Sequence, residues 1–187
     1  NAQVVIHDDA DLAITIPQLS LAKMRNGGAA CTSANRIYVQ RGIAQAFITE
    51  MTKSMSSFVM GRGTEATTTL GAYVSMKERN KIADIVDESI AAGAKVEVGG
   101  VKPEGEGAFY PATVLVVKKD NPILLHEIFG PGAPIVIFDT DEEGIELAND
   151  CDLKFKNSQN QRLLVELSLM QIASISFDGE KKKLNPI

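Results

Sequence analysis

The sequence predicts an α/β fold in which helices flank a mostly parallel sheet, in a three-layer arrangement. Short apolar segments alternate along the chain with longer segments whose apolar residues recur every three or four positions. Hydrophobic residues make up 44% of the 187 residues and charged residues 23%, a balance typical of globular domains. The sequence contains no internal repeat and no low-complexity linker, so we expect a single domain over residues 1–187.

The first helix is expected to run from about residue 10 to residue 25. Asp8 or Asp9 is placed to cap it, because a carboxylate there can accept hydrogen bonds from the free amides of the first turn. Pro17 is expected to bend this helix. The other elements continue the alternation, with strands at 4–6, 36–40, 95–98, 110–117, 133–138 and 173–177, and helices at 43–58, 75–92, 141–149 and 161–171.

Two of these helices are indicated by clear periodicity. From 75 to 92 one face carries Ile82, Ile85, Val86 and Ile90, and Gly93 is a typical C-terminal stop. From 43 to 58 the apolar residues that recur at helical spacing are Ala44, Phe47, Ile48, Met51, Met55 and Phe58.

Composition and charge argue against several classes of protein. A formal net charge of −5 offers no basic surface for nucleic acid. The two cysteines form neither a disulfide framework nor a metal-ligand pattern, so we expect no metal site and a reducing compartment, the cytoplasm. No apolar stretch approaches the roughly 18 residues of a membrane span. The start resembles no signal peptide and lacks an initiator methionine, so we expect the chain to begin inside a larger protein.

The most informative segment runs from Arg25 to Arg36 and contains Cys31. Gly27–Ala30 precede the cysteine with small side chains, which leaves room for another molecule to approach the sulfur. A lone cysteine is more often a buried structural thiol. Here the small neighbours and the surrounding motif favour a nucleophile.

This segment, R-N-G-G-A-A-C-T-S-A-N-R, resembles the active-site cysteine region of aldehyde dehydrogenases, which reads roughly F-R-N-x-G-Q-x-C-x-x-x-x-R. Alanines replace the family's glutamine and threonine before the cysteine. Further matches cover about residues 1–152 in the family's order, whereas 153–187 diverge. These matches are 1–12, 93–96 with 99–100, 109–113, 127–131 (E-I-F-G-P) and 148–150 (A-N-D).

The resemblance implies the oxidation of an aldehyde to a carboxylic acid with NAD or NADP, through a cysteine thiohemiacetal and a thioester. Cys31 matches the nucleophile, and its backbone N–H matches one donor to the oxyanion. Glu127 and Phe129 match the cofactor-binding residues that hold the nicotinamide ribose and pack near the nicotinamide ring. Cys151 is interpreted as structural.

Two parts of the family's machinery are expected to lie outside this chain. The general-base glutamate of the family's E-L-G-G motif would fall just before Asn1, and the nucleotide-binding domain, which binds most of the cofactor, is absent. We therefore expect residues 1–187 to be a catalytic domain that is inactive alone.

The parent enzyme is expected to act on a small aldehyde as a homo-oligomer, without a nucleic-acid or membrane partner. Residues 35–40 suggest a succinate-semialdehyde dehydrogenase type. The alternative is a divergent, noncatalytic domain that acts in assembly or binding, which the divergence of residues 153–187 favours.

Overall fold

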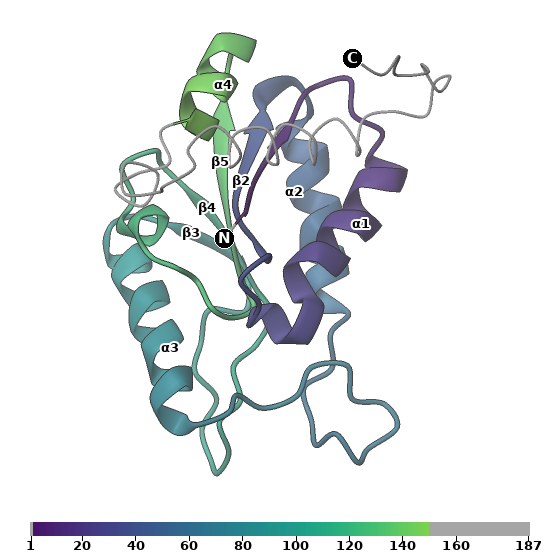
Figure 1. The fold of residues 1–187 in the computed structure, drawn as a ribbon, viewed down its shortest axis with the longest axis vertical. Coiled ribbons are helices and arrows are strands. Elements are labelled where there is room, and N and C mark those ends of the chain that lie inside the picture. The colour runs from purple at the N-terminus through teal and green to yellow at the C-terminus, as the bar shows by residue number, and fades with distance from the viewer. Residues whose placement is uncertain (1, 150–187) are drawn as a thin grey trace, which may run out of the picture.

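The computed structural model describes residues 2–149, whose strands form one five-stranded sheet in the order β1-β2-β5-β4-β3 (Figure 1). The first four strands in this order are parallel, and β3 pairs antiparallel with β4 at one edge. The strands are β1 (Ala2–Ile6), β2 (Ala34–Gln40), β3 (Lys95–Val98), β4 (Thr113–Val117) and β5 (Gly132–Phe138).

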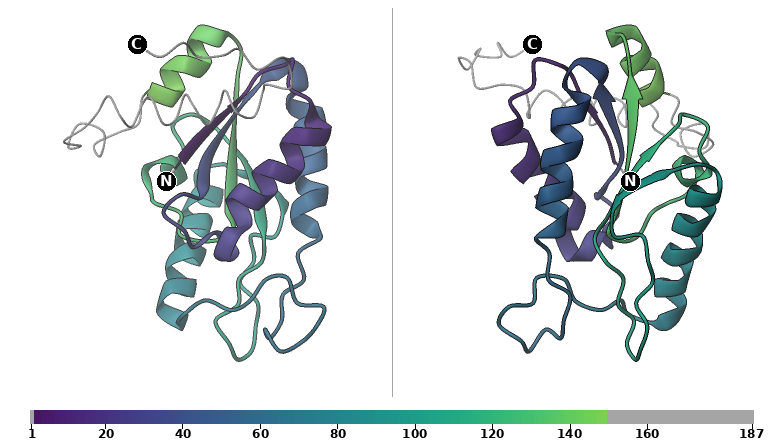
Figure 2. Two further views of the ribbon diagram at one scale, coloured as in Figure 1. Left: turned by 45° about the vertical axis from the view of Figure 1, so that its right-hand side comes forward. Right: turned by 180° about the vertical axis from the view of Figure 1, so that it is seen from behind.

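Helices cover both faces of the sheet and produce three layers, as Figure 2 shows from two further sides. One face is covered by α1 (Leu12–Met24) and α2 (Arg41–Ser56), and the other by α3 (Met76–Ala91). The short α4 (Asp141–Asn149) follows β5 and contributes to the second face. The expected α/β fold, mostly parallel and flanked by helices, is confirmed.

Each strand contributes to two hydrophobic cores because its side chains alternate between the faces. In β2, Ile37 and Val39 pack under α1 and α2, while Tyr38 packs under α3. The periodic residues of α2 behave as expected: Phe47, Met51 and Met55 are fully buried. In α3, Ile82, Ile85 and Val86 are buried as expected, but Ile90 is exposed, which corrects the expected face.

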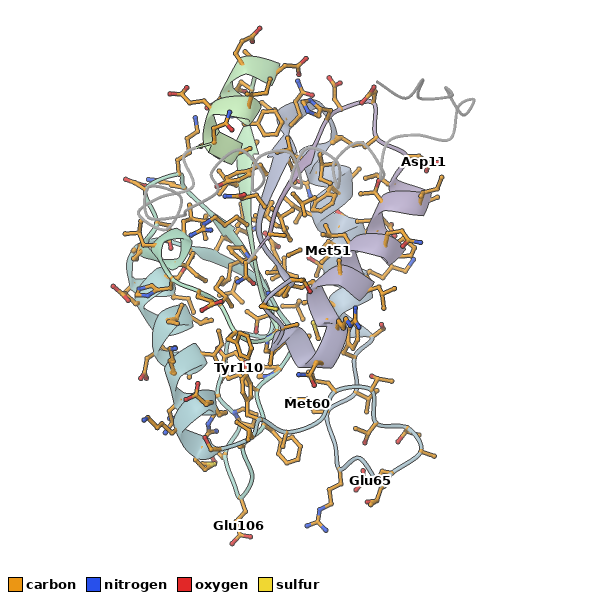
Figure 3. The ribbon with its side chains drawn as sticks, in the orientation of Figure 1. Asp11, Met51, Met60, Glu65, Glu106 and Tyr110 are labelled. Atoms are coloured by element: carbon orange, nitrogen blue, oxygen red, sulfur yellow. The ribbon has the colours of Figure 1, made fainter. Side chains whose placement is uncertain are left out.

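Helix α1 begins later than the sequence indicated. Asp11 is its N-cap, and the Asp11 carboxylate accepts a 2.8 Å hydrogen bond from the Ala13 N–H (Figure 3 labels Asp11 at the start of this helix). Asp8 and Asp9 do not cap it, because they lie in a turn closed by a 3.1 Å bond from the Ala10 N–H to the His7 carbonyl. Pro17 lies on the exposed side of a helix that the structure describes as continuous.

Strand β4 is shorter than expected and begins at Thr113 rather than at residue 110. Pro111 accounts for the difference, because proline has no N–H with which to join a ladder in the interior of a sheet. Tyr110 is nevertheless buried in the second core. The helix expected at 161–171 and the strand expected at 173–177 lie outside the described residues.

Two loops extend from one end of the molecule, and Figure 3 shows Glu65 and Glu106 near their tips. The first loop joins α2 to α3, and the second joins β3 to β4. A 2.7 Å bond from the Tyr73 N–H to the Ala108 carbonyl ties the loops together. Within residues 2–149, no helix has the length and apolar character needed to cross a bilayer.

Candidate functional site

The predicted site residues lie just before two neighbouring strands. β2 and β5 are parallel and hydrogen-bonded, with Ile37 opposite Ile135. Cys31 precedes β2, and Glu127 and Phe129 precede β5. The amino ends of parallel strands lie at the same end of the sheet, so the fold brings these two segments to that end.

The two segments are in direct backbone contact at Gly28 and Gly130. Gly28 has φ +78°, and a Cβ added there would overlap the Gly130 carbonyl oxygen and lie 2.5 Å from its carbon. Only a residue without a side chain allows this approach. The loop that contains Cys31 and the segment that contains Glu127 and Phe129 therefore lie side by side.

A left-handed bend carries the chain from α1 toward Cys31. Asn26 and Gly27 have φ angles of 53° and 63°, a conformation that asparagine and glycine adopt more readily than other residues. The Asn26 Nδ2 donates a 2.9 Å hydrogen bond to the Ala29 carbonyl and closes the bend. The conformation of the segment therefore depends on the residues that the motif contains.

Cys31 stands at the tip of the turn that follows. The Ser33 N–H donates a 3.0 Å bond to the Ala30 carbonyl, which closes a turn with Cys31 and Thr32 at its centre. Both central residues are exposed, and Cys31 is a free thiol. Within residues 2–149 no backbone carbonyl accepts a hydrogen bond from the Cys31 N–H. Sulfur and amide are thus both open to an incoming molecule.

The segment before β5 is anchored by its central residue. Ile128 is fully buried in the second core, while Glu127 and Phe129 on either side are exposed, Phe129 by 43%. The preceding 3₁₀ turn, Pro122–Leu125, is held by a 2.7 Å bond from Arg36 Nε of β2 to the Leu124 carbonyl. The anchor presents a carboxylate and an aromatic ring at the surface.

A cavity of about 780 Å³ adjoins both segments. Phe129 forms part of its wall, together with the bend before Cys31 and the segment that leads into α3. Cys31 and Glu127 are not lining residues and lie beside it. The lining residues are Met24, Asn26, Gly27, Ala29, Thr69, Leu70, Gly71, Ala72, Tyr73, Val74, Glu78 and Phe129.

Sequence analysis missed the far wall, which residues 69–74 and Glu78 form. The small pair Gly71-Ala72 is the signal that marks it, because small residues leave room for a ligand. Tyr73 packs against Gly130, where an added Cβ would overlap the phenol oxygen. Burial raises the pKa of the Tyr73 phenol, so this part of the wall is uncharged at neutral pH.

Across 2–149, no group of three or more histidine, cysteine, aspartate or glutamate side chains is arranged to hold a metal ion.

Comparison with known proteins shows the same relationship along most of the chain. The model of the aldehyde dehydrogenase family matches residues 1–157. A succinate-semialdehyde dehydrogenase of Paenarthrobacter nicotinovorans is 40% identical over 150 residues, which are 80% of this chain and 33% of that protein. The lactaldehyde dehydrogenase of Escherichia coli strain K12 is 33% identical over 159 residues, 84% of this chain and 33% of that protein.

Solved structures agree with the sequence comparison. The crystal structure of lactaldehyde dehydrogenase from Escherichia coli superimposes with a TM-score of 0.76 at 34% identity, over 80% of this chain and 32% of that one. A succinate-semialdehyde dehydrogenase from Burkholderia pseudomallei gives 0.77 at 34% identity, over 80% and 31%. The chain spans about a third of the length of these relatives. It belongs to the aldehyde dehydrogenase family.

Proposed function

We propose that this chain is the catalytic domain of an NAD- or NADP-dependent aldehyde dehydrogenase in which Cys31 is the nucleophile. The observation that carries the proposal is the contact between Gly28 and Gly130, which brings the Cys31 loop beside Glu127 and Phe129. All the relatives named above are dehydrogenases, so the alternative of a noncatalytic assembly domain gains no support.

Cys31 performs the first chemical step. Its sulfur loses the thiol proton and adds to the aldehyde carbon, the carbonyl π bond breaks, and the oxygen takes up a proton to become the hydroxyl of a thiohemiacetal. The open Cys31 N–H can donate to that oxygen while it is negatively charged. Loss of one such donor in other enzymes costs about 2.7–4 kcal/mol of barrier reduction.

The thiohemiacetal must then lose a hydride from carbon and a proton from its hydroxyl to become a thioester, and water must cleave the thioester to release the acid and restore the thiol. Bound NAD or NADP would supply the hydride acceptor. The residues present fit the nicotinamide end of that cofactor, since an exposed aromatic ring and carboxylate adjoin a cavity whose walls include Gly27, Ala29 and Gly71. Phe129 would pack near the ring, and Glu127 would hold the ribose.

The water-activating glutamate is proposed to precede Asn1. β1 begins at Ala2, opposite Ala34, at the same edge of the sheet as Cys31. The amino end of β1 therefore lies at the same end of the sheet as the cysteine loop. We further propose that the parent protein is cytoplasmic and homo-oligomeric.

The test is nicotinamide reduction by the longer protein that contains this chain, with a panel of small aldehydes. Succinic semialdehyde comes first, because the relative at 40% identity is named for it. We expect turnover by the longer protein and none by the 187-residue chain alone, because a positioned acceptor supplies several kcal/mol of the barrier reduction.

Cys31→Ala should abolish turnover in the longer protein, and Cys151→Ala is the matched control that should leave it intact. Undiminished turnover by Cys31→Ala would remove Cys31 from the mechanism. Turnover by the 187-residue chain alone would show that the cofactor site has been assigned to the wrong part of the protein.

A further inference from the structure

Lys23 is a buried lysine on a helix face that otherwise packs into the core. It shares that face of α1 with Ile16, Leu19 and Ser20, and its relative exposure is 0%. Lysine is almost never buried to this degree without a charged partner. Its Nζ instead donates a 2.7 Å hydrogen bond to the Oδ1 of Asn35, which is 1% exposed.

The backbone of Lys23 forms a second link across the same gap. Its carbonyl accepts a 3.0 Å bond from the hydroxyl of Ser33, which is also buried. Lys23 lies at the end of α1, and Ser33 and Asn35 lie at the start of β2. The two bonds therefore join the ends of the loop that contains Cys31.

Ser33 passes this link on to the cysteine. Its N–H closes the turn around Cys31 by bonding to the Ala30 carbonyl, and its own carbonyl accepts a 3.1 Å bond from the Ala2 N–H of β1. One residue thus connects α1, β1 and the turn. The cluster of Lys23, Ser33 and Asn35 is called the clamp below, and its member Ser33 closes the turn that contains Cys31.

Burial in the clamp disfavours the charged amine and lowers the pKa of Lys23 to about 7. A methionine of similar length would fill the same space without this cost. An apolar residue could therefore supply the same packing. What the amine adds is the hydrogen bond to Asn35.

We propose that Lys23 is a positioning residue for Cys31. Through its bonds to Asn35 and Ser33, Lys23 fixes the orientation of the Ala30–Ser33 turn. The proposal rests on the proposed function, because a fixed thiol and N–H matter only if they act together on a carbonyl. In the clamped turn both groups stay open at the surface. Without the amine, the bond between Lys23 and Asn35 is lost, and the ends of the loop keep only the bond from the Ser33 hydroxyl to the backbone carbonyl of residue 23.

The first test is hydrogen exchange on the full 187-residue chain, with Lys23→Met against wild type. Removal of one buried hydrogen bond should speed exchange of the amides in 24–35 by about tenfold. Exchange in α3 should not change. Lys53→Met is the matched control, since Lys53 is an exposed lysine of α2, and it should leave both regions unchanged. Equal exchange in 24–35, or an equal rise in α3, would overturn the proposal.

The second test separates exposure of the thiol from its orientation. Iodoacetamide alkylation of Cys31, with Cys151 as the internal reference, should stay within about twofold in Lys23→Met because the thiol remains exposed. Protection of Cys31 by succinic semialdehyde should need about tenfold more aldehyde, because the adduct requires the oriented N–H. Unchanged protection would overturn the positioning role. Absence of protection in wild type would instead count against the proposed function, and hydrogen exchange would still decide whether Lys23 holds the turn.

Discussion

Replacement of Gly28 by alanine is predicted to separate the two halves of the candidate site. Two effects add at this position. The φ of +78° is a left-handed conformation, which costs a residue with a Cβ about 1–2 kcal/mol. The new Cβ would also overlap the Gly130 carbonyl, and overpacking of this kind costs about 1–3 kcal/mol. The free energy of unfolding should fall by about 2–5 kcal/mol.

Two other glycines separate these contributions. Gly93 has φ +92°, and an added Cβ there would meet nothing within 4 Å, so Gly93→Ala should cost only the conformational part, about 1–2 kcal/mol. Gly63 has no positive φ and open space around it, so Gly63→Ala should change stability by less than about 1 kcal/mol.

The free energy of unfolding of all three variants is measured by urea titration, with circular dichroism as the signal. Aldehyde protection of Cys31 in the folded proteins should weaken for Gly28→Ala alone, because only that change opens the contact with Gly130. Two results together would refute the close approach of the two loops. Gly28→Ala would unfold no more easily than Gly93→Ala, and the aldehyde would protect Cys31 in Gly28→Ala as well as in wild type.

The remaining predictions concern stability. Lys23 has a lowered pKa in the folded chain and an ordinary one when unfolded, so the unfolded state binds more protons above about pH 7. Stability should rise by about 2 kcal/mol between pH 7 and 9 in urea titrations, and an equal rise in Lys23→Met would contradict the assignment to this amine. Asp11→Ala should cost about 1 kcal/mol through loss of the α1 cap, while Asp9→Ala should cost almost nothing; thermal melts that rank them in the opposite order would refute the cap. Asn121 is buried, and its side chain accepts a bond from the Ser89 hydroxyl and donates one to the Ser89 carbonyl. Asn121→Ala should cost about 2–4 kcal/mol in urea unfolding, and a loss below that of Asp11→Ala would show that this link between α3 and the segment before β5 is unimportant.

The sequence predicted the elements that repeat a simple pattern and missed those decided by a single residue. Strands β2 and β5 follow from short runs of mostly buried residues, and α2 follows from its helical periodicity. The start of α1 depended on which of several aspartates reaches a free amide, and the start of β4 on the missing N–H of Pro111. Such local competition has no periodic signature.

The candidate site divides in the same way. The family motifs implied that Cys31, Glu127 and Phe129 belong to one site, and the two segments that carry them meet at Gly28 and Gly130. The burial of Lys23 was not, since a lysine in a helical pattern is ordinarily placed on the solvated face. Its position seven residues after Ile16 and four after Leu19 was the available signal. The wall at 69–74 depends on how a long loop folds back, which spacing along the chain does not encode.

The reactivity of Cys31 tests the central claim most directly. The full chain is treated with iodoacetamide, with and without succinic semialdehyde, and labelling at Cys31 and Cys151 is followed by peptide mass analysis. The account predicts faster labelling of Cys31 than of Cys151, because the Cys31 sulfur is exposed at the tip of a turn among small residues. It also predicts that the aldehyde slows labelling at Cys31 alone. Equal rates at the two cysteines, faster labelling of Cys151, or no slowing at Cys31 would contradict its assignment as the nucleophile.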